Sequence, residues 1–319
     1  MKDKKEETMF DFENREENKI ISKARSRSYM KIISISFTIT VFVLIIGIAS
    51  KLQLSPYIIT NKIIEIESYN DVVGANTFIG PWDEENKIFK SGATAIRYKL
   101  IGNKPVYMGT VDINKVDYEE QLITENDGIY SYYGNKIMEF YHPFVEYDKY
   151  SNDLENIDII DANKNIEMGL SFDKQYTIEE VEEILPKSVS INWLWVDTIK
   201  GDYLEAIKKL DNGVTKIDAQ VLTQNQVVGF STIEEDGNPK VKPVDDFIEN
   251  LKFGMSKGGK YKKDIKHIYQ SLAENSENID KNKIKIIGAV VVGDKEGLNQ
   301  LKDLDIIKSS SMGVTNNKY

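Results

Sequence analysis

The chain has 319 residues, with 41 Lys and Arg against 51 Asp and Glu, a formal net charge of −10 and no cysteine. The lack of cysteine excludes disulfides, thiol nucleophiles and cysteine-based metal sites. The acidic balance disfavours direct binding to nucleic acid. A hydrophobic fraction of 41% is enough for a packed core and is not typical of general disorder.

The first 31 residues are polar, except for an early apolar cluster that acidic side chains surround. Aromatic anchors with an acidic surround are typical of a short segment that binds a basic partner. A disordered leader is the alternative interpretation. The candidate partner-binding residues are Met9, Phe10, Phe12, Glu13, Glu16 and Glu17, with Asp11 adding charge.

Residues 32–50, IISISFTITVFVLIIGIAS, carry no charge and lie between Lys31 and Lys51. As a helix they would be roughly 28 Å long, about the thickness of the hydrocarbon core of a bilayer. Twelve of the 19 are Ile, Leu, Val or Phe. The pattern predicts a retained transmembrane helix. A buried core helix and a cleaved signal peptide, with Gly47-Ile48-Ala49 as its site, are the alternatives.

Positive charges precede the span, whereas positions 51–64 carry only Lys51 and Lys62. Lys and Arg are retained in the cytoplasm. The sequence therefore predicts that the N-terminus lies inside the cell and that everything after Ser50 lies outside. The basic residues nearest the span, within positions 19–31, are Lys19, Lys23, Arg25, Arg27 and Lys31, and no acidic residue lies among them.

The pattern of residues 51–160 predicts a membrane-proximal region outside the cell. Leu52–Glu67 reads as a stalk helix broken at Pro56. Ala93–Ile101 and Val106–Val111 alternate as the two strands of a hairpin. Two aromatic strands flank a second hairpin turn at Gly134-Asn135. The Asn- and Asp-rich stretch 148–165 is a possible domain boundary.

From Ile166 the pattern alternates between strands and helices. Thr177 and Glu180 form a capping box at the start of the helix 177–185, and Pro186 ends this helix. The last strand, helix and strand imply a parallel pair, followed by a polar tail from Ser310. The expected strands are 166–172, 188–198, 227–233, 283–292 and 305–309; further helices are expected at 203–210, 244–253, 261–272 and 294–304.

The chemical motifs are weak. Residues 254–260 match G-x4-G-K, but no strand precedes them and Tyr261 replaces the Ser or Thr that binds magnesium. His142 and His267 stand apart and read as structural or exposed. The run 234–237 suits a hairpin turn better than a calcium loop. Trp193 and Trp195, on one strand face, read as core rather than as sugar platforms. We therefore expect no catalytic residues, no metal site, no cofactor and no enzymatic activity.

Two parts of the chain resemble the sigma factor regulator family of membrane-bound anti-sigma factors. Lys23–Ile33 is similar to the N-terminal domain of that family. The C-terminal resemblance is carried by LSFDK at 170–174 with Tyr176, NWLWVD at 192–197, VGF at 228–230 and GAVVVG at 288–293. Residues 51–160 match the family only by position.

This resemblance implies that the inner segment holds an extracytoplasmic-function sigma factor and that the outer domain relays a signal. About 30 residues are too few for a compact helical sigma-binding domain, so either a short helix suffices or a second membrane protein completes the site. Membrane lipid is a further expected partner. A cell-envelope sensor or binding protein unrelated to transcription is the main alternative, and a membrane-anchored hydrolase is a distant third.

The predicted fold class is α+β, with a single transmembrane helix followed by an extracytoplasmic mixed α/β domain. The protein is expected in the cell membrane, and its chain is expected to divide into four regions. These are a cytoplasmic segment at 1–31, the span at 32–50, a membrane-proximal region at 51–160 and a C-terminal domain similar to sigma factor regulators at 161–319.

Overall fold

The computed structural model describes residues 3–115, 122–125, 128–211, 216–274 and 276–318, and only the backbone for 3–16, 125, 210–211 and 216. The chain divides into two compact units. The first comprises Met1–Tyr57 and Asn86–Ser91, and the second comprises Ile58–Glu85 and Gly92–Tyr319.

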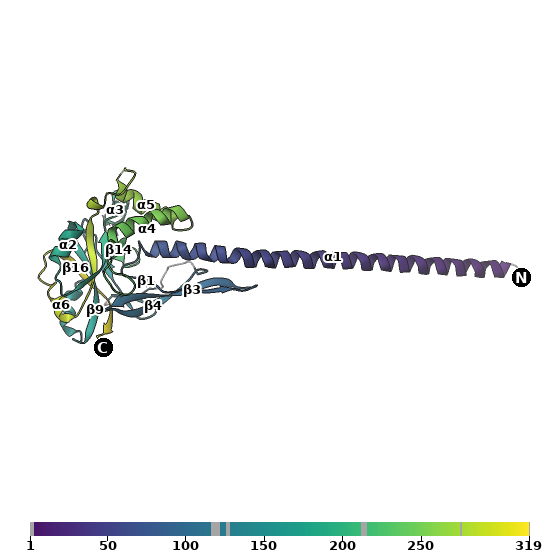
Figure 1. Ribbon diagram of the computed structural model, residues 1–319, viewed down its shortest axis with the longest axis horizontal. Helices are drawn as coiled ribbons and strands as arrows, with labels where there is room; N and C mark the ends of the chain where they lie inside the picture. The colour runs from purple at the N-terminus through teal and green to yellow at the C-terminus, as the bar shows by residue number, and fades with distance from the viewer. Residues whose placement is uncertain (1–2, 116–121, 126–127, 212–215, 275, 319) are drawn as a thin grey trace. The chain divides into compact units, whose positions relative to one another are not determined.

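The first unit consists mainly of helix α1, which runs over Asp3–Asn70 (Figure 1). Its apolar stretch 32–50 is exposed throughout. Two hydroxyls in this stretch form hydrogen bonds within the helix. The Oγ1 atoms of Thr38 and Thr40 donate to the carbonyls four residues earlier, each at 2.9 Å. Such bonds lower the cost of placing hydroxyls in an apolar surround.

The predicted break at Pro56 is wrong, because α1 continues through this residue. Proline lacks the N–H that would bond to the carbonyl of Leu52, four residues earlier. Asn86 compensates, since its Nδ2 donates to that carbonyl at 3.3 Å. The orphaned acceptor is therefore satisfied from the neighbouring loop.

The second unit begins with the end of α1 and a small sheet of four strands in the order β1–β3–β2, with β4 on β3. The predicted hairpin of β3 and β4 is confirmed, and Gly102 and Asn103 take positive φ at its turn. The second predicted hairpin is also confirmed, as β6 and β7 around Gly134. The bounds are β1 Phe78–Ile79, β2 Asp83–Asn86, β3 Ser91–Ile101, β4 Lys104–Asp112, β5 Leu122–Glu125, β6 Gly128–Ser131 and β7 Lys136–Ile137.

A five-stranded sheet in the order β14–β10–β15–β9–β16 forms the centre of this unit, and every neighbouring pair in it is antiparallel. The α+β class is therefore confirmed. The bounds are β9 Lys164–Tyr176, β10 Ser190–Val196, β14 Gly229–Ser231, β15 Ile286–Gly293 and β16 Ile307–Asn317; short strands elsewhere are β8 Glu139–Phe140, β11 Leu210–Asp211, β12 Lys216–Ile217 and β13 Leu222–Thr223.

β15 and β16 are parallel to each other as predicted, but the predicted direct pairing between them is wrong. Both strands run antiparallel to β9, which lies between them. The prediction of a polar tail from Ser310 is also wrong, since β16 extends to Asn317 and buries Ser309, Ser310 and Ser311. Ser310 shows why: its Oγ donates to Oδ1 of Asn152 at 2.9 Å, so a polar residue is satisfied inside the unit.

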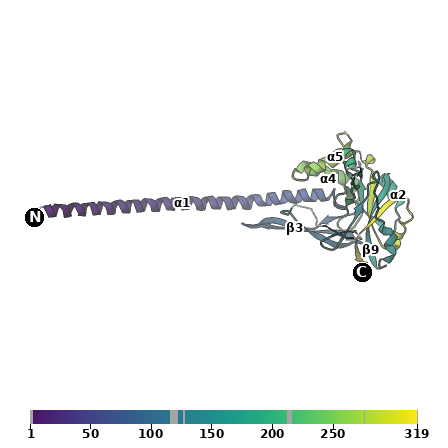
Figure 2. The same ribbon diagram turned by 180° about the vertical axis from the view of Figure 1, so that it is seen from behind.

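Helices α2, α4, α5 and α6 pack in the core on one face of this sheet, and α3 packs in the core on the other. The capping box of α2 is confirmed: Thr177 Oγ1 accepts from the N–H of Glu180, whose carboxylate accepts from the N–H of Thr177. Helices α4 and α5 lie side by side in both views (Figures 1 and 2). The bounds are α2 Ile178–Ile184, α3 Gly201–Ile207, α4 Pro243–Lys257, α5 Lys262–Ala273 and α6 Lys295–Asn299, with 3-10 helices η1 Asp153–Ile159 and η2 Lys281–Lys283.

The two larger apolar cores of the described residues lie against the sheet, and residues before 160 contribute to both. The first joins Ile59, Ile63 and Ile66 of α1 to β9, β15 and the helices. The second packs Phe140 and its neighbours on Trp193 and Trp195, which are therefore core residues as predicted. The domain boundary predicted at residue 160 stays a prediction.

An ion pair lies in the interior of the second unit. Lys99 of β3 and Glu167 of β9 are fully buried, with Nζ and Oε2 2.8 Å apart. Gln224 accepts a second bond from Lys99 at 2.7 Å, while Asn76 and the N–H of Val314 donate to Glu167. The pair thus ties β3 to the central sheet.

Candidate functional site

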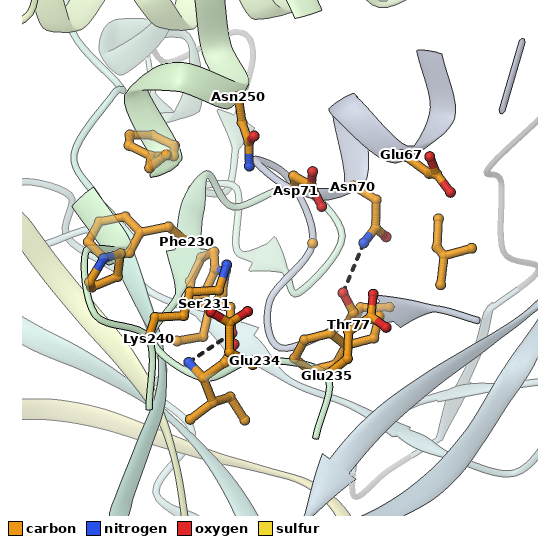
Figure 3. Close-up of a pocket in the computed structure, with 17 residues that line it drawn as sticks. Glu67, Asn70, Asp71, Thr77, Phe230, Ser231, Glu234, Glu235, Lys240 and Asn250 are labelled. Atoms are coloured by element: carbon orange, nitrogen blue, oxygen red, sulfur yellow. Dashed lines mark hydrogen bonds between the residues drawn. The ribbon is translucent and has the colours of Figure 1, made fainter. Parts of the chain in front are cut away.

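The second unit contains a pocket of about 310 Å³ with an acidic lining (Figure 3). One side is formed by the end of α1 and the turn that follows it, and the other by β14, the loop after it and the start of α4. The lining residues are Glu67, Asn70, Asp71, Gly74, Thr77, Phe78, Ile79, Trp193, Phe230, Ser231, Ile233, Glu234, Glu235, Lys240, Pro243, Phe247 and Asn250.

The turn after α1 is held by backbone and side-chain bonds. Val73 pairs with Val228 in an isolated bridge, and the N–H of Gly74 donates to the carbonyl of Val227 at 3.3 Å. Gly74 has φ +105, which a residue with a side chain rarely adopts. Asn70 Nδ2 donates to the carbonyl of Thr77 at 2.9 Å. These contacts fix the turn that carries Asp71.

The electrostatics of the pocket are dominated by carboxylates. Asp71 is an exposed residue, but the protein around its carboxyl group partly removes it from water, and this desolvation raises its pKa to about 6. Lys240 acts to lower that pKa, whereas the negative charges of Glu67 and Glu235 add to the rise. Four carboxylates face one ammonium in the lining, so the pocket disfavours anions.

Aromatic side chains form the apolar part of the lining. Phe230 and Phe247 have ring centroids 5.3 Å apart, and both are buried. Phe78 stacks on Tyr98 at 5.6 Å. Glu67 is oriented by Trp82, whose Nε1 donates to its carboxylate at 2.8 Å. Carboxylates beside aromatic faces suit an amine or other cationic group chemically.

The sequence pattern does not indicate this pocket, although residues 234–237 stand out in it as an acidic turn. The structure places Glu234 and Glu235 in the lining and makes Asp236 part of a turn, where its carboxylate accepts from the N–H of Asn238 at 2.9 Å. Among the residues that the structure describes, no group of three His, Asp or Glu suits a metal ion. The other half of the pocket comes from residues more than 150 positions earlier, so no local signal could indicate it.

The two histidines lie in different surroundings. His142 is buried; its Nε2 lies 3.3 Å from Oδ1 of Asp197, and its Nδ1 accepts from the N–H of Phe144 at 3.4 Å. Hydrogen bonds to Asp197 lower the pKa of its carboxyl against the opposing effect of burial. Both ring nitrogens are therefore engaged, which suits a structural role. His267 is exposed on α5.

The predicted partner-binding residues lie at the start of α1. The backbone of Met9, Phe10, Phe12, Glu13 and Glu16 is helical, but their side chains fall outside the described residues. Glu17 is exposed. Their role as binding residues stays a prediction.

The family-like stretches meet on the central sheet. LSFDK lies on β9 and GAVVVG on β15, while NWLWVD lies on β10 up to Val196 and VGF enters β14 at Gly229. Their glycines make room for tryptophan: a Cβ on Gly229 would come within 2.4 Å of the Trp193 ring, and one on Gly288 within 2.8 Å of the Trp195 ring. The residues that carry the resemblance thus form one packing unit.

The chain is an α+β protein whose one N-terminal helix is long and apolar enough to cross a membrane, consistent with single-pass anchoring. Residues 157–314 match the family model described as sigma factor regulator C-terminal. These residues form a C-terminal domain of the sigma factor regulator family, which implies an interaction with a sigma factor. The chain matches no curated protein and no solved structure.

Proposed function

We propose that this protein is a membrane-anchored anti-sigma factor for an extracytoplasmic-function sigma factor, with its N-terminus in the cytoplasm. It acts by binding rather than by catalysis. The inner segment holds the sigma factor, and the outer domain relays a signal to it. The family match over residues 157–314 is the observation that carries this proposal.

Membrane anchoring is supported by the surroundings of the apolar stretch of α1. Its side chains are exposed all around the helix, whereas a core helix would be buried on at least one face. Exposed tyrosines flank it, Tyr29 at 65% and Tyr57 at 71%. Tyrosine is enriched where a transmembrane helix meets the head groups. The excess of Lys and Arg before Ile32 supports an inner N-terminus.

Binding at the inner segment is argued from the chemistry of the partner. The DNA-binding surfaces of a sigma factor must be basic to hold phosphates. An acidic segment with Met9, Phe10 and Phe12 as anchors complements such a surface. A second membrane protein that completes the contact would be compatible with the shortness of this segment.

The test is co-purification of the sigma factor from solubilised membranes. Phe10→Ala with Phe12→Ala should weaken retention at least about tenfold, because each buried Phe contributes about 1.5–3 kcal/mol and part of this is offset by ordering the segment. Transcription from the sigma-dependent promoter should rise in parallel.

The matched control is Ile20→Ala with Ile21→Ala, which removes exposed apolar side chains from the same helix, nearer the span. It should leave retention close to that of the parent. Unchanged retention after deletion of residues 2–18 would overturn this segment as the binding site. Loss of retention in the control alone would move the contact toward the membrane.

The acidic pocket favours one second candidate function, a cell-envelope sensor or binding protein unrelated to transcription. Under that function, no sigma factor would co-purify from solubilised membranes. The isolated second unit would instead retain a cationic envelope component.

A further inference from the structure

The loop between β2 and β3 exposes two apolar side chains at its tip. Phe89 is 99% exposed and Ile88 is 45% exposed. Single exposed apolar residues are common on protein surfaces and need no explanation. The location of this pair is what gives it meaning, because the loop residues 86–91 belong to the same compact unit as the apolar stretch of α1.

The loop is held against the first turn of α1 after the apolar stretch. Lys51, next after Ser50, donates from Nζ to the carbonyl of Lys87 and, at 2.6 Å, to that of Ile88. One turn further, Ser55 Oγ lies 3.1 Å from Ser91 Oγ. With a rise of about 1.5 Å per residue, Lys51 stands at the end of the span, and so does the loop tip bonded to it.

The composition of the tip matches the boundary between head groups and acyl chains. Aromatic and apolar side chains settle at this boundary, and basic side chains beside them are attracted to anionic phosphates. Lys87 and Lys90 flank Ile88 and Phe89, and all four are exposed. Tyr57, exposed on α1 less than two turns beyond Lys51, adds a residue typical of the same boundary.

We propose that residues 87–90 form a second membrane contact, in which Ile88 and Phe89 enter the bilayer interface where the span leaves it. Lys87 and Lys90 lie toward the phosphates of anionic lipids. The occupant is the phospholipid surface rather than another protein, because the tip is bonded to Lys51, the residue that directly follows the span. This inference rests on the membrane-spanning part of the proposed function and on nothing said there about sigma factors.

The test uses the full chain, which has no native cysteine. Phe89→Cys, Phe42→Cys and Asn18→Cys are spin-labelled one at a time, and each protein is reconstituted in vesicles of phosphatidylcholine and phosphatidylglycerol. Accessibility to oxygen and to a water-soluble nickel chelate then reports depth. All three positions are exposed on the protein, so the substitutions should leave folding intact.

The label at position 89 should be several-fold less accessible to the nickel chelate than the label at 18, and less deeply placed than the label at 42. Lys87→Gln with Lys90→Gln should move the label at 89 toward water in anionic vesicles, and much less in vesicles of phosphatidylcholine alone.

Equal nickel accessibility at 89 and 18, with 42 protected, would overturn the second contact while the span stands. Water access at 42 would overturn both the span and the contact. Spin–spin broadening at position 89 would indicate a second copy of the chain at the tip and would also overturn the lipid contact.

Discussion

Lys99 is a charged side chain without exposure to solvent, and its environment explains how it is tolerated. Its ammonium meets the carboxylate of Glu167 and the amide oxygen of Gln224, and Asn76 donates a further bond to Glu167. A buried charge is costly unless it is paired and hydrogen-bonded. The network meets this condition, and it joins four separate parts of the second unit.

Lys99→Met should therefore destabilise the protein by about 3–5 kcal/mol, because it leaves the carboxylate of Glu167 buried without its counter-ion. Lys99→Met with Glu167→Gln should recover much of this loss, since no uncompensated charge remains. Urea unfolding of both variants measures the effect. Lys208→Met is the control: its pair with Glu205 is largely exposed, and its loss should cost no more than about 1 kcal/mol.

Asp71 should make stability fall as pH rises from about 4 to 6. Burial raises its folded-state pKa to about 6 from an ordinary value of 3.8. Between these values the folded state keeps a proton that the unfolded state has released, so the free energy of unfolding decreases with pH. The loss is absent below this window and complete above it.

Asp71→Asn is neutral at every pH and lacks this dependence. Relative to the parent, the variant should gain stability as pH rises from 4 to 6, and the difference should then stay constant up to pH 7. Urea unfolding at each pH measures it. Asp236→Asn is the control, because hydrogen bonds from Asn238 lower the pKa of Asp236 and place its effect below pH 4. A stability difference between Asp71→Asn and the parent that does not change with pH would contradict the raised pKa of Asp71.

At the scale of elements, local signals predicted local structure. The capping box of α2 depends on two residues three positions apart, and the first hairpin depends on its turn. The order of β15, β9 and β16 depends on a strand that precedes β15 by more than 100 residues, so strand–helix–strand spacing alone suggested the wrong pairing. The helix break predicted at Pro56 was wrong for the same reason, since Asn86 compensates for the missing hydrogen bond from outside the helix.

The candidate site, too, could be predicted only where its residues are close in sequence. The run Glu234-Glu235 was visible as an acidic turn, but the pocket needs Glu67 and Asp71 from the end of α1. The buried pair was equally hidden: a Lys in an alternating strand reads as an exposed position, and its partner Glu167 lies on another sheet. The sequence pattern indicates which face of a helix or strand is apolar, whereas tertiary packing decides which faces contact one another.

The orientation of α1 yields a labelling prediction. Val241→Cys in the second unit is at a site 91% exposed, and it should react with an impermeant thiol reagent in intact cells. Asn18→Cys, exposed before the span, should react only after the membrane is opened. The asymmetry of Lys and Arg is the physical reason. Labelling of Asn18→Cys alone in intact cells would reverse the proposed topology.

At the scale of the whole molecule, the question is whether residues 161–319 fold without the chain that precedes them. The family match begins at residue 157 and covers the central sheet. The apolar cores do not follow that limit. Ile59, Ile63 and Leu154 belong to the core on one face of the sheet, and Phe140 and Tyr141 to the core on the other.

A fragment of residues 161–319 should therefore lack cooperative unfolding, whereas a fragment of residues 58–319 should unfold in one transition. Each buried large apolar side chain contributes about 1.5–3 kcal/mol. The loss of five such side chains would therefore remove most or all of the roughly 5–15 kcal/mol by which a typical domain is stable against unfolding. Trp193 and Trp195 are retained in both fragments and are at most 3% exposed in the intact unit. In the shorter fragment their fluorescence should shift to the red, because Phe140 no longer covers Trp195, 5.3 Å away. Blue-shifted emission with a sharp urea transition in residues 161–319 would instead establish the boundary predicted at residue 160.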